Sequence, residues 1–548
     1  MNKQALIHVE NTDSLLELAH FLNDFGWTIL SANQTEEILR KDKIPVVREA
    51  SLVDNIFNQN DITVLNRRLM MTKIMPEDGT VANASSETGD IFLVCLNMKP
   101  LLDSNQKHFQ LKNFARPVNY FITTLLRTAF INHANILILT DPADYKEAMI
   151  QIRTDDISDE FRLYLAGKAL NMVAACDSGI AASILAASQD KFYFMNYLTY
   201  PFSKQFQLSS GLNSQQTASL YRYPTNSGAV SGFSKFTGKE LNYNIITDVS
   251  LAWEQISALY DNLKTQVAVK SVNCDGYAFT TQLTPLTGTV FTIAVKFKSI
   301  IGAALATNVH ESFEKTYSYD TKHIKDVTLG CSAVIDQSAA ELIAKCNFIA
   351  IIAPDFTPEA RHILSENKHT RLISTARVLE TDFEGQLVSG GLIIQTKDLK
   401  LFNHWNVKTK NRPSQFRTDE LAFGMLLAKG ARSYSIILLK QNSIVGIAQG
   451  CTCVENAIEQ ALSEAEKFAA RRNNSENSAQ TENEKESIAD IMVCDSVIPF
   501  CDSIKKCIEK GVSAIIQTGG SLDDKEFTEY CNEHDVVMVF TDMTHISY

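Results

Sequence analysis

The first 200 residues alternate short apolar runs with amphipathic segments. The apolar runs have the length of buried strands and cover residues 5–9, 27–30, 91–96 and 136–140. Between the first two runs, Leu15, Leu18 and Leu22 fall on one face of a helix. A long helical segment at residues 160–187 follows the last run. This repetition of strand, helix and strand predicts a parallel sheet covered by helices.

From about residue 207 the pattern changes to more strands and several strong helices. The clearest helices and buried strands of this region are predicted at residues 419–429, 455–470, 513–517 and 536–540. Residues 471–487 (RRNNSENSAQTENEKES) have one alanine as their only apolar residue, so they cannot bury a face. We predict a mobile loop there, and two domains at residues 1–200 and 201–548.

Composition and charge exclude several classes of protein. Of 548 residues, 45% are hydrophobic and 21% are charged, as in ordinary globular proteins. With 51 Lys and Arg against 63 Asp and Glu, the net charge of -12 gives no basic footprint for nucleic acid. The apolar runs are far shorter than a membrane helix, and the N-terminus has no signal-peptide pattern. These features predict a cytoplasmic protein that binds neither nucleic acid nor membrane.

The cysteines and histidines predict no catalytic metal. The 11 cysteines are scattered, and Cys451 and Cys453 form a lone C-x-C without a matching pair. Scattered cysteines of odd number fit reduced thiols in a reducing compartment.

Residues 495–548 carry the most specific signature in the chain. They contain DSVIPFCD, AIIQTGGS and MVFTDMTHISY. These resemble the SDAFFPFRD, AIIQPGGS and MVFTGMRHF segments of the AICAR transformylase/IMP cyclohydrolase family of purine biosynthesis. Further similar blocks follow the family's order: TDPADY (140–145), GKELNYN (238–244), IIAPDFTPEA (351–360), GGLIIQ (390–395) and WNVKTKNRP (405–413). The resemblance spans nearly the whole chain.

The resemblance implies an α/β architecture and two reactions. The N-terminal domain would be a methylglyoxal-synthase-like Rossmann domain that closes the purine ring to give IMP. The larger transformylase domain would consist of two cytidine-deaminase-like α/β subdomains that transfer a formyl group from 10-formyltetrahydrofolate to AICAR. If that domain is inactive, no cofactor is expected. The family also implies a homodimer with transformylase sites built across it.

Most polar residues of the family's cyclohydrolase site are replaced. The STGGT turn reads SANQT, which keeps Ser31 and Thr35 but loses the two glycines that let N–H groups approach a phosphate. The tyrosine of NLYPF becomes Lys99, the aspartate of the next block becomes Asn119, and its lysine becomes Ile131. The remaining substrate-binding candidates are Ser31, Thr35 and Lys99. Lys99 could complete a new anion pocket, although a surface lysine is the simpler interpretation.

The family's catalytic Lys-His pair, in KHxNPCG, has lost its histidine. One register places the lysine at Lys270, and the other places it at Lys296, followed by Phe297, after a strand-rich insertion near residues 276–292. We favour Lys296, because residues 311–320 (ESFEKTYSYD) then fall where the family's next helix begins. A remnant catalytic group and a solvated lysine at a strand end are equal interpretations of Lys296.

Other transformylase positions are partly retained. The asparagine of KSNA becomes Tyr434, and an arginine of the tail becomes Thr544. The substrate-binding candidates of this domain keep their family identity: Gly211, Asn213, Gln216, Gly519 and Gly520. Asn213 and Gln216 could hold a planar amide ligand or only form a turn. His133 and His545 lie at family-like positions, where a structural role is the simpler reading.

The replaced positions are those that would touch substrate, while the apolar pattern is kept. This predicts a divergent paralogue with altered or lost activity on AICAR or a related ribonucleotide or folate. Lys296 and Tyr434 are its candidate catalytic groups. The alternative is a pseudoenzyme that binds a nucleotide or folate, or pairs with an intact family member. A third possibility is that the chain performs the family reactions with residues that the alignment misplaces.

Overall fold

The computed structural model describes most of the chain, in two compact units. The described residues are 3–49, 65, 69, 90–98, 117–187, 194–223, 232–263, 267–283, 286, 288–319, 326–376, 383–475 and 487–547. Unit 1 comprises Met1–Ser203 with Tyr221–Thr225, and unit 2 comprises Lys204–Leu220 with Asn226–Tyr548. The change from unit 1 to unit 2 between Ser203 and Lys204 lies close to the predicted domain boundary at residue 200. Lys99 and the predicted insertion's central residues 284, 285 and 287 are outside the described residues.

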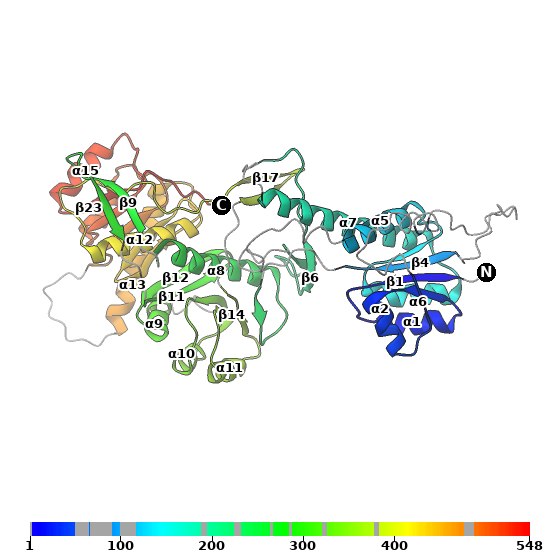
Figure 1. Cartoon of the computed structure of the whole chain (residues 1–548). Helices are drawn as coiled ribbons and strands as arrows, with labels where there is room; N and C mark the ends of the chain where they lie inside the picture. The colour runs from blue at the N-terminus through cyan, green and yellow to red at the C-terminus, as the bar shows by residue number, and fades with distance from the viewer. Residues whose placement is uncertain are drawn as a thin grey trace. The chain divides into compact units, whose positions relative to one another are not determined.

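Unit 1 is a parallel five-stranded sheet with helices on both faces (Figure 1). Its elements are β1 (Gln4–His8), α1 (Leu15–Asp24), β2 (Thr28–Ser31), α2 (Asn33–Lys41), β3 (Val46–Arg48), β4 (Ile91–Leu96), α5 (Pro117–Ile131), β5 (Leu137–Leu139), the 3-10 turn η2 (Pro142–Asp144), α6 (Tyr145–Thr154) and α7 (Asp159–Ala187). The strand order is β3-β2-β1-β4-β5, and every pairing is parallel. The predicted parallel sheet is confirmed.

The strands of unit 1 are continuously apolar because both faces of the sheet are covered. Ala5 and Ile7 of β1 pack with α1 and α6, whereas Leu6 between them packs with α5 and α7. Alternate residues of a strand point to opposite faces, so a strand buried on both sides needs apolar residues at every position.

Unit 2 is built around one 12-stranded mixed sheet. The elements of its first half are β8 (Ser234–Lys235), α8 (Tyr243–Leu263), β11 (Val290–Lys296), β12 (Ser299–Ala306), α9 (Val309–Tyr319), β13 (Val327–Cys331), α10 (Gln337–Ile343), β14 (Phe348–Ala353), α11 (Pro358–Ser365) and β15 (Arg371–Ser374). Those of its second half are β18 (Asn406–Val407), α12 (Gln415–Gly430), β19 (Ile436–Lys440), β20 (Ser443–Ala448), α13 (Val454–Ser475), β21 (Ile491–Cys494), α14 (Asp502–Glu509), β22 (Ala514–Gln517), α15 (Asp524–Glu533) and β23 (Val537–Phe540).

The two halves repeat one arrangement. The strand order is β18-β23-β22-β21-β19-β20-β12-β11-β13-β14-β15-β8, which reads the same from either end once corresponding strands are exchanged. The halves meet where Ala304 of β12 pairs antiparallel with Ser443 of β20. Equivalent pairs have the same sense in both halves, including the parallel pairs β13–β14 and β21–β22. Unit 2 therefore consists of two α/β halves related by an approximate twofold axis through the sheet.

The helices of unit 2 form layers on both faces of this sheet. Helices α8 and α12 share one core with strands of both halves, where the rings of Phe291 and Phe423 meet edge to face with centroids 5.6 Å apart. The opposite face carries α9, α10 and α11 over the first half and α13, α14 and α15 over the second. A shared layer on one face joins the halves into one body.

Among the described residues, three two-stranded sheets lie outside the two main sheets. They are β6 (Ser203–Leu208) with β7 (Ala218–Arg222), β9 (Val267–Val272) with β10 (Ala278–Leu283), and β16 (Phe383–Val388) with β17 (Gly391–Thr396). Strand β10 lies within the expected insertion near residues 276–292, whereas β9 precedes it. Residues 290–292 of that segment are part of β11 in the large sheet.

The predicted loop at residues 471–487 is partly wrong. Helix α13 extends to Ser475 and thus includes the start of that segment. Residues 476–486 are outside the described residues. Among the helices that the structure describes, none is long and apolar enough to cross a membrane.

Candidate functional site

The C-terminal ends of β1 and β4 form the switch point of the unit 1 sheet, where α/β proteins commonly bind ligands. Ser31 and Thr35 are both buried beside it. Ser31 Oγ donates to the carbonyl of Ile7 at 2.7 Å, and Thr35 Oγ1 accepts from the N–H of Val9 at 3.1 Å. These two candidates therefore fasten β2 and α2 to β1 and turn their hydroxyl groups into the fold.

The side chain of Asn97, directly after β4, forms hydrogen bonds with backbone N–H groups of the loop after β1. Its Oδ1 accepts from the N–H groups of Glu10 and Asn11 at 2.8 and 2.9 Å, and its Nδ2 donates to the Asn11 carbonyl at 3.2 Å. Loop N–H groups of this kind can bind a phosphate. Here a buried carboxamide holds them. Sequence reasoning missed Asn97, because its partners are 86 and 87 positions away and its only local signal is a polar residue after a buried strand.

The family-like TDPADY block is organised around a lysine of α7. Lys168 Nζ lies 2.8 Å from Asp141 Oδ2 and 2.6 Å from Asp144 Oδ2. Burial raises the pKa of Asp144, and the hydrogen bond and charge of Lys168 offset part of that rise. The Asp141 side chain also accepts from the N–H of Ala143 and caps η2. This block thus anchors α7 against η2.

Lys296 is the last residue of β11, at a tight turn into β12. Phe297 and Lys298 have φ of 52° and 55°, the left-handed pair typical of a type I′ hairpin turn. Asp248 of α8 closes the turn, since its Oδ2 and Oδ1 accept from the N–H groups of Phe297 and Lys298 at 3.1 and 2.7 Å. Burial raises the pKa of Asp248, while the two N–H donors and the charge of Lys296 lower it in part. The lysine therefore stands next to a buried carboxylate and an exposed phenyl ring.

The second half of unit 2 repeats this turn. Gln441 and Asn442 also have positive φ, of 51° and 59°. Glu420 of α12 accepts from the Asn442 N–H at 3.1 Å, as Asp248 does in the first half. The repeat favours Lys296 over Lys270 as the counterpart of the family lysine, because Lys270 lies in the separate β9–β10 sheet. Helix α9 also begins at Val309, close to the helix start expected from that register.

Tyr434 lies on a segment next to the Lys296 hairpin. Arg432 Nη2 donates to Ser299 Oγ, in the first residue of β12, at 2.9 Å. Tyr434 itself is half-buried, and its N–H donates to the Cys451 carbonyl at 3.1 Å. The structure thus brings together the segments that carry the two catalytic candidates.

Gly211, Asn213 and Gln216 close a turn on one another. The Gln216 side-chain oxygen accepts from the Asn213 N–H at 2.9 Å, and the Gly211 N–H donates to the Gln216 carbonyl at 2.8 Å. A Cβ at Gly211 would lie 2.7 Å from that of Gln216, so the glycine is needed for the turn itself. The turn-forming interpretation of these candidates accounts for all three residues.

Gly519 and Gly520 follow β22 with φ of 80° and 106°. A Cβ at Gly519 would lie 2.4 Å from the Phe540 ring, whereas nothing lies within 4 Å of one at Gly520. The Gly520 N–H donates to Asp524 Oδ2 at 2.7 Å. Packing and capping within the fold therefore account for this turn.

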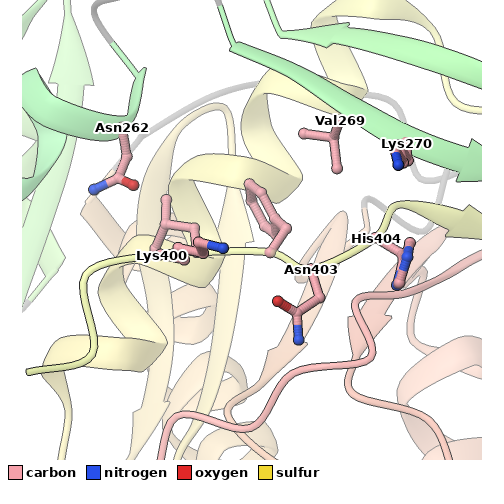
Figure 2. Close-up of a pocket in the computed structure, with 8 residues that line it drawn as sticks. Asn262, Val269, Lys270, Lys400, Asn403 and His404 are labelled. Atoms are coloured by element: carbon pink, nitrogen blue, oxygen red, sulfur yellow. The ribbon is translucent and has the colours of Figure 1, made fainter. Parts of the chain in front are cut away.

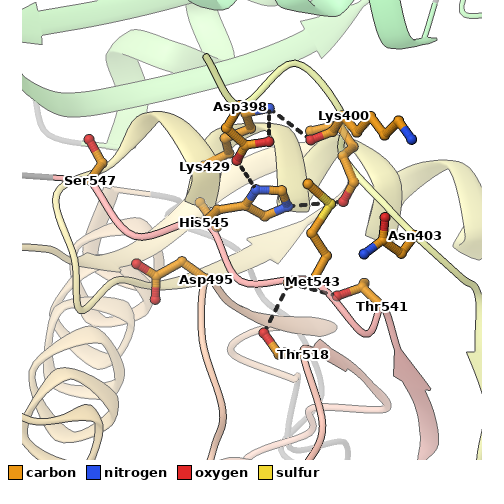
Figure 3. Close-up of polar contacts among 12 residues, drawn as sticks. Asp398, Lys400, Asn403, Lys429, Asp495, Thr518, Thr541, Met543, His545 and Ser547 are labelled. Carbon is orange, nitrogen blue, oxygen red and sulfur yellow. Dashed lines mark hydrogen bonds and ion pairs between the residues drawn. The ribbon is translucent and has the colours of Figure 1, made fainter. Parts of the chain in front are cut away.

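His545 is the centre of a buried polar network in the C-terminal tail (Figure 3). Its Nδ1 lies 2.6 Å from Asp398 Oδ2, and its Nε2 lies 3.0 Å from the Leu401 carbonyl. Lys429 Nζ lies 3.3 Å from Asp398 Oδ1 and donates to the Lys400 carbonyl at 2.8 Å. Burial alone would raise the pKa of Asp398, but the hydrogen bond with His545 and the charge of Lys429 bring it below its usual value. The network fixes an irregular segment, residues 398–404, and supports the structural reading of His545.

Asp495, at the start of the tail signature, is fully buried below this network. Its Oδ1 accepts from the Ser435 N–H at 3.2 Å, and its carbonyl accepts from the His545 N–H at 2.9 Å. Ser433 Oγ donates to its other carboxylate oxygen. Asp495 therefore ties the tail to the segment that carries Tyr434.

A cavity of about 540 Å³ opens beside the fixed segment (Figure 2). It lies between the β9 strand and residues 400–404 and is lined by Asn262, Val269, Lys270, Lys400, Leu401, Phe402, Asn403 and His404. None of these residues was a binding candidate from the sequence. Lys270 is the alternative position of the family lysine in the sequence.

The chemistry left at the family positions is limited. Lys296 can carry a positive charge, and Tyr434 can donate a proton, but Phe297 can do neither. The hydroxyl groups of Ser31 and Thr35 form hydrogen bonds with the backbone of the fold. The N–H groups of Asn213 and Gly520 are bonded by side chains of their own turns.

A family model and curated relatives both connect the chain to one family. The sequence model of a family described as "AICARFT/IMPCHase bienzyme" matches residues 129–464. The bifunctional purine biosynthesis protein PurH of Clostridium acetobutylicum is 28% identical over 556 residues, and that of Petrotoga mobilis is 27% identical over 561 residues. Each alignment covers 100% of both chains. A solved structure described as "Crystal structure of ForH" is 23% identical, covers 34% of this chain and 100% of that chain, and has a TM-score of 0.28, too low to carry an argument.

Proposed function

The chain belongs to the AICARFT/IMPCHase bienzyme family, and from this premise we propose that it is a divergent member that binds a purine ribonucleotide or reduced folate but has lost formyl transfer and ring closure at the family's sites. One observation carries the proposal. Ser31 and Thr35, two positions that the resemblance assigns to substrate, are buried and hydrogen-bonded to the backbone of β1 and its following residue. A group that is already bonded and buried must break that bond before it can bind a ligand.

Formyl transfer places a specific demand on the Lys296 site. The amine of AICAR must lose a proton as it attacks the formyl carbon of 10-formyltetrahydrofolate. At the position of the family histidine, Phe297 offers neither a lone pair nor a proton. The residues present therefore do not fit the proton transfer that the formyl donor requires.

The binding half of the proposal can be tested by calorimetric titration. The wild-type protein is titrated with AICAR, IMP and 10-formyltetrahydrofolate, each followed by a turnover assay of the same sample. We expect saturable binding of at least one ligand without product. Absence of binding for all three would contradict a ligand-binding role and favour a protein partner.

A second candidate function is an enzyme that uses Lys296 and Tyr434. The Arg432–Ser299 hydrogen bond of 2.9 Å favours it, because this bond holds the two candidate segments together. In this case Lys296→Ala should abolish turnover of a confirmed substrate. Lys298→Ala is the matched control, since it removes an exposed lysine from the same turn and should leave turnover unchanged.

We further propose that unit 2 mediates the homodimer implied by the family. The β16–β17 hairpin exposes large apolar side chains, with Leu387 83% and Ile393 59% accessible. Exposed apolar groups clustered on one short hairpin are typical of an interface. Light scattering should give the mass of a dimer, and Leu387→Glu should shift it to the monomer. Pairing with an intact family member would use the same hairpin and would appear as a heterodimer on mixing.

A further inference from the structure

The cavity between β9 and residues 400–404 has the composition of an anion site. Lys270 enters from the β9 strand, and Lys400, Asn403 and His404 enter from the segment below it in Figure 2. Among the described residues, no carboxylate forms an ion pair with the ammonium group of Lys270 or Lys400. Two lysines without partners across one cavity create a positive potential that a bound anion would neutralise.

Two carboxylates beside the lining segment, Asp398 and Asp542, contact other side chains rather than the two cavity lysines. Asp542 Oδ2 lies 3.3 Å from His404 Nδ1 and accepts a hydrogen bond from Asn406 Nδ2 at 2.8 Å. Asp398 is held by His545 and Lys429. The excess positive charge of the cavity therefore comes from its two lysines.

The remaining lining suits an anion with an apolar body. Val269, Leu401 and Phe402 supply an apolar wall, and the Phe402 ring is fixed edge to face against Trp405 with centroids 5.2 Å apart. Asn262 and Asn403 each use one amide hydrogen on a backbone carbonyl, of Ala258 and Asp542, and keep a second hydrogen to donate.

The irregular segment that lines the cavity is fixed before any ligand arrives. The Lys400 carbonyl accepts a hydrogen bond from Lys429 Nζ at 2.8 Å. The Leu401 carbonyl lies 3.0 Å from His545 Nε2. On the other side, the Trp405 N–H donates to the carbonyl of Lys270 at 2.9 Å, which joins the segment to β9. A preorganised wall loses little conformational entropy on binding.

We propose that this cavity binds a small organic phosphate, with the phosphate between Lys270 and Lys400 and the organic group against Phe402. The site is distinct from the Lys296 hairpin, and β9, which forms one of its walls, precedes the expected insertion near residues 276–292. It does not depend on the function proposed above.

The test uses phenyl phosphate and inorganic phosphate as probes in calorimetric titrations of the full chain. We expect phenyl phosphate to bind with a Kd on the order of 1 mM or tighter, and about fivefold tighter than inorganic phosphate because of the apolar wall. Lys270→Ala and Lys400→Ala should each weaken binding by about fivefold to tenfold. Lys368→Ala is the control, since it removes an exposed lysine elsewhere in unit 2 and should leave binding unchanged.

Three results would overturn the proposal. The first is that phenyl phosphate does not bind, and the second is that the wild type and both cavity variants bind it equally. The third is that AICAR fully displaces phenyl phosphate while AICAR binding itself is unaffected by either lysine substitution. The last would place the phosphate in the ribonucleotide site. All these variants change exposed side chains, so circular dichroism should show each one folded.

Discussion

Replacement of His545 by alanine should destabilise unit 2 by about 3 kcal/mol. The imidazole side chain is fully buried, at 0% accessibility, and both of its nitrogens are engaged. The substitution removes both contacts at once and leaves their partners, Asp398 and the Leu401 carbonyl, in place.

The magnitude follows from these two contacts. A hydrogen bond to a charged group contributes about 1.5–3 kcal/mol and one to a neutral carbonyl about 1 kcal/mol. Asp398 would retain only the charge of Lys429, 3.3 Å away, and the Leu401 carbonyl would lose its partner. The void left by the ring adds to this cost, and local relaxation reduces it.

Urea unfolding followed by tryptophan fluorescence measures the effect. Trp253 and Trp405 are both buried in unit 2, and Trp405 directly follows the segment that His545 holds. Thr544→Ala is the matched control, since it changes the exposed neighbouring residue and should shift the free energy of unfolding by less than about 0.5 kcal/mol. Hydrogen exchange of residues 398–404 should accelerate in His545→Ala only. A loss below about 1 kcal/mol with unchanged exchange would show that the network does not hold the segment.

The same network predicts a pH dependence. The pKa of Asp398 is lower in the folded protein than the value of about 3.9 in an unfolded chain. Its ionised form therefore stabilises the fold above that value, and the contribution is lost as the pH falls through the folded pKa. The stability difference between the wild type and Asp398→Asn should shrink as the pH falls below about 4. A difference that grows on acidification would contradict the sign of this linkage.

Two further predictions concern the candidate turns. Asn97→Ala should lower the free energy of unfolding of unit 1 by about 1–3 kcal/mol and speed hydrogen exchange at the N–H groups of Glu10 and Asn11. Unchanged exchange at these two groups would contradict the prediction. Gly519→Ala should cost at least about 2 kcal/mol of stability, because its Cβ would lie 2.4 Å from an aromatic ring. Gly520→Ala has open space around it and should cost about 1–2 kcal/mol from its backbone conformation alone. Equal losses of stability in urea unfolding would refute the packing argument.

The sequence predicts the elements of the sheets well, because burial imposes local patterns. The run at residues 91–96 is β4, and the helical patterns at 160–187 and 419–429 correspond to α7 and α12. The twofold repeat of unit 2 has no such signal. Its halves share burial patterns and strand order without a readable repeat of residues, so only the resemblance to a family suggested two subdomains.

The direction of polar side chains could not be predicted in the same way. Ser31 and Thr35 keep the residue types expected of a binding turn, yet their hydroxyl groups face β1. His545 and Asp398 are 147 positions apart, and no spacing in the sequence links them. Such contacts depend on where the chain returns in three dimensions, which local periodicity does not contain.

The measurement that tests the central claim most directly is a formyl-transfer assay with AICAR and 10-formyltetrahydrofolate at saturating concentrations. The Clostridium acetobutylicum relative, measured in parallel, supplies the reference rate. We predict no product above the uncatalysed rate from this chain, because Phe297 offers no group for the proton transfer at the position of the family histidine. Turnover at a rate comparable to that of the relative, and its loss in Lys296→Ala, would contradict the account and show that the family chemistry has been retained on this scaffold.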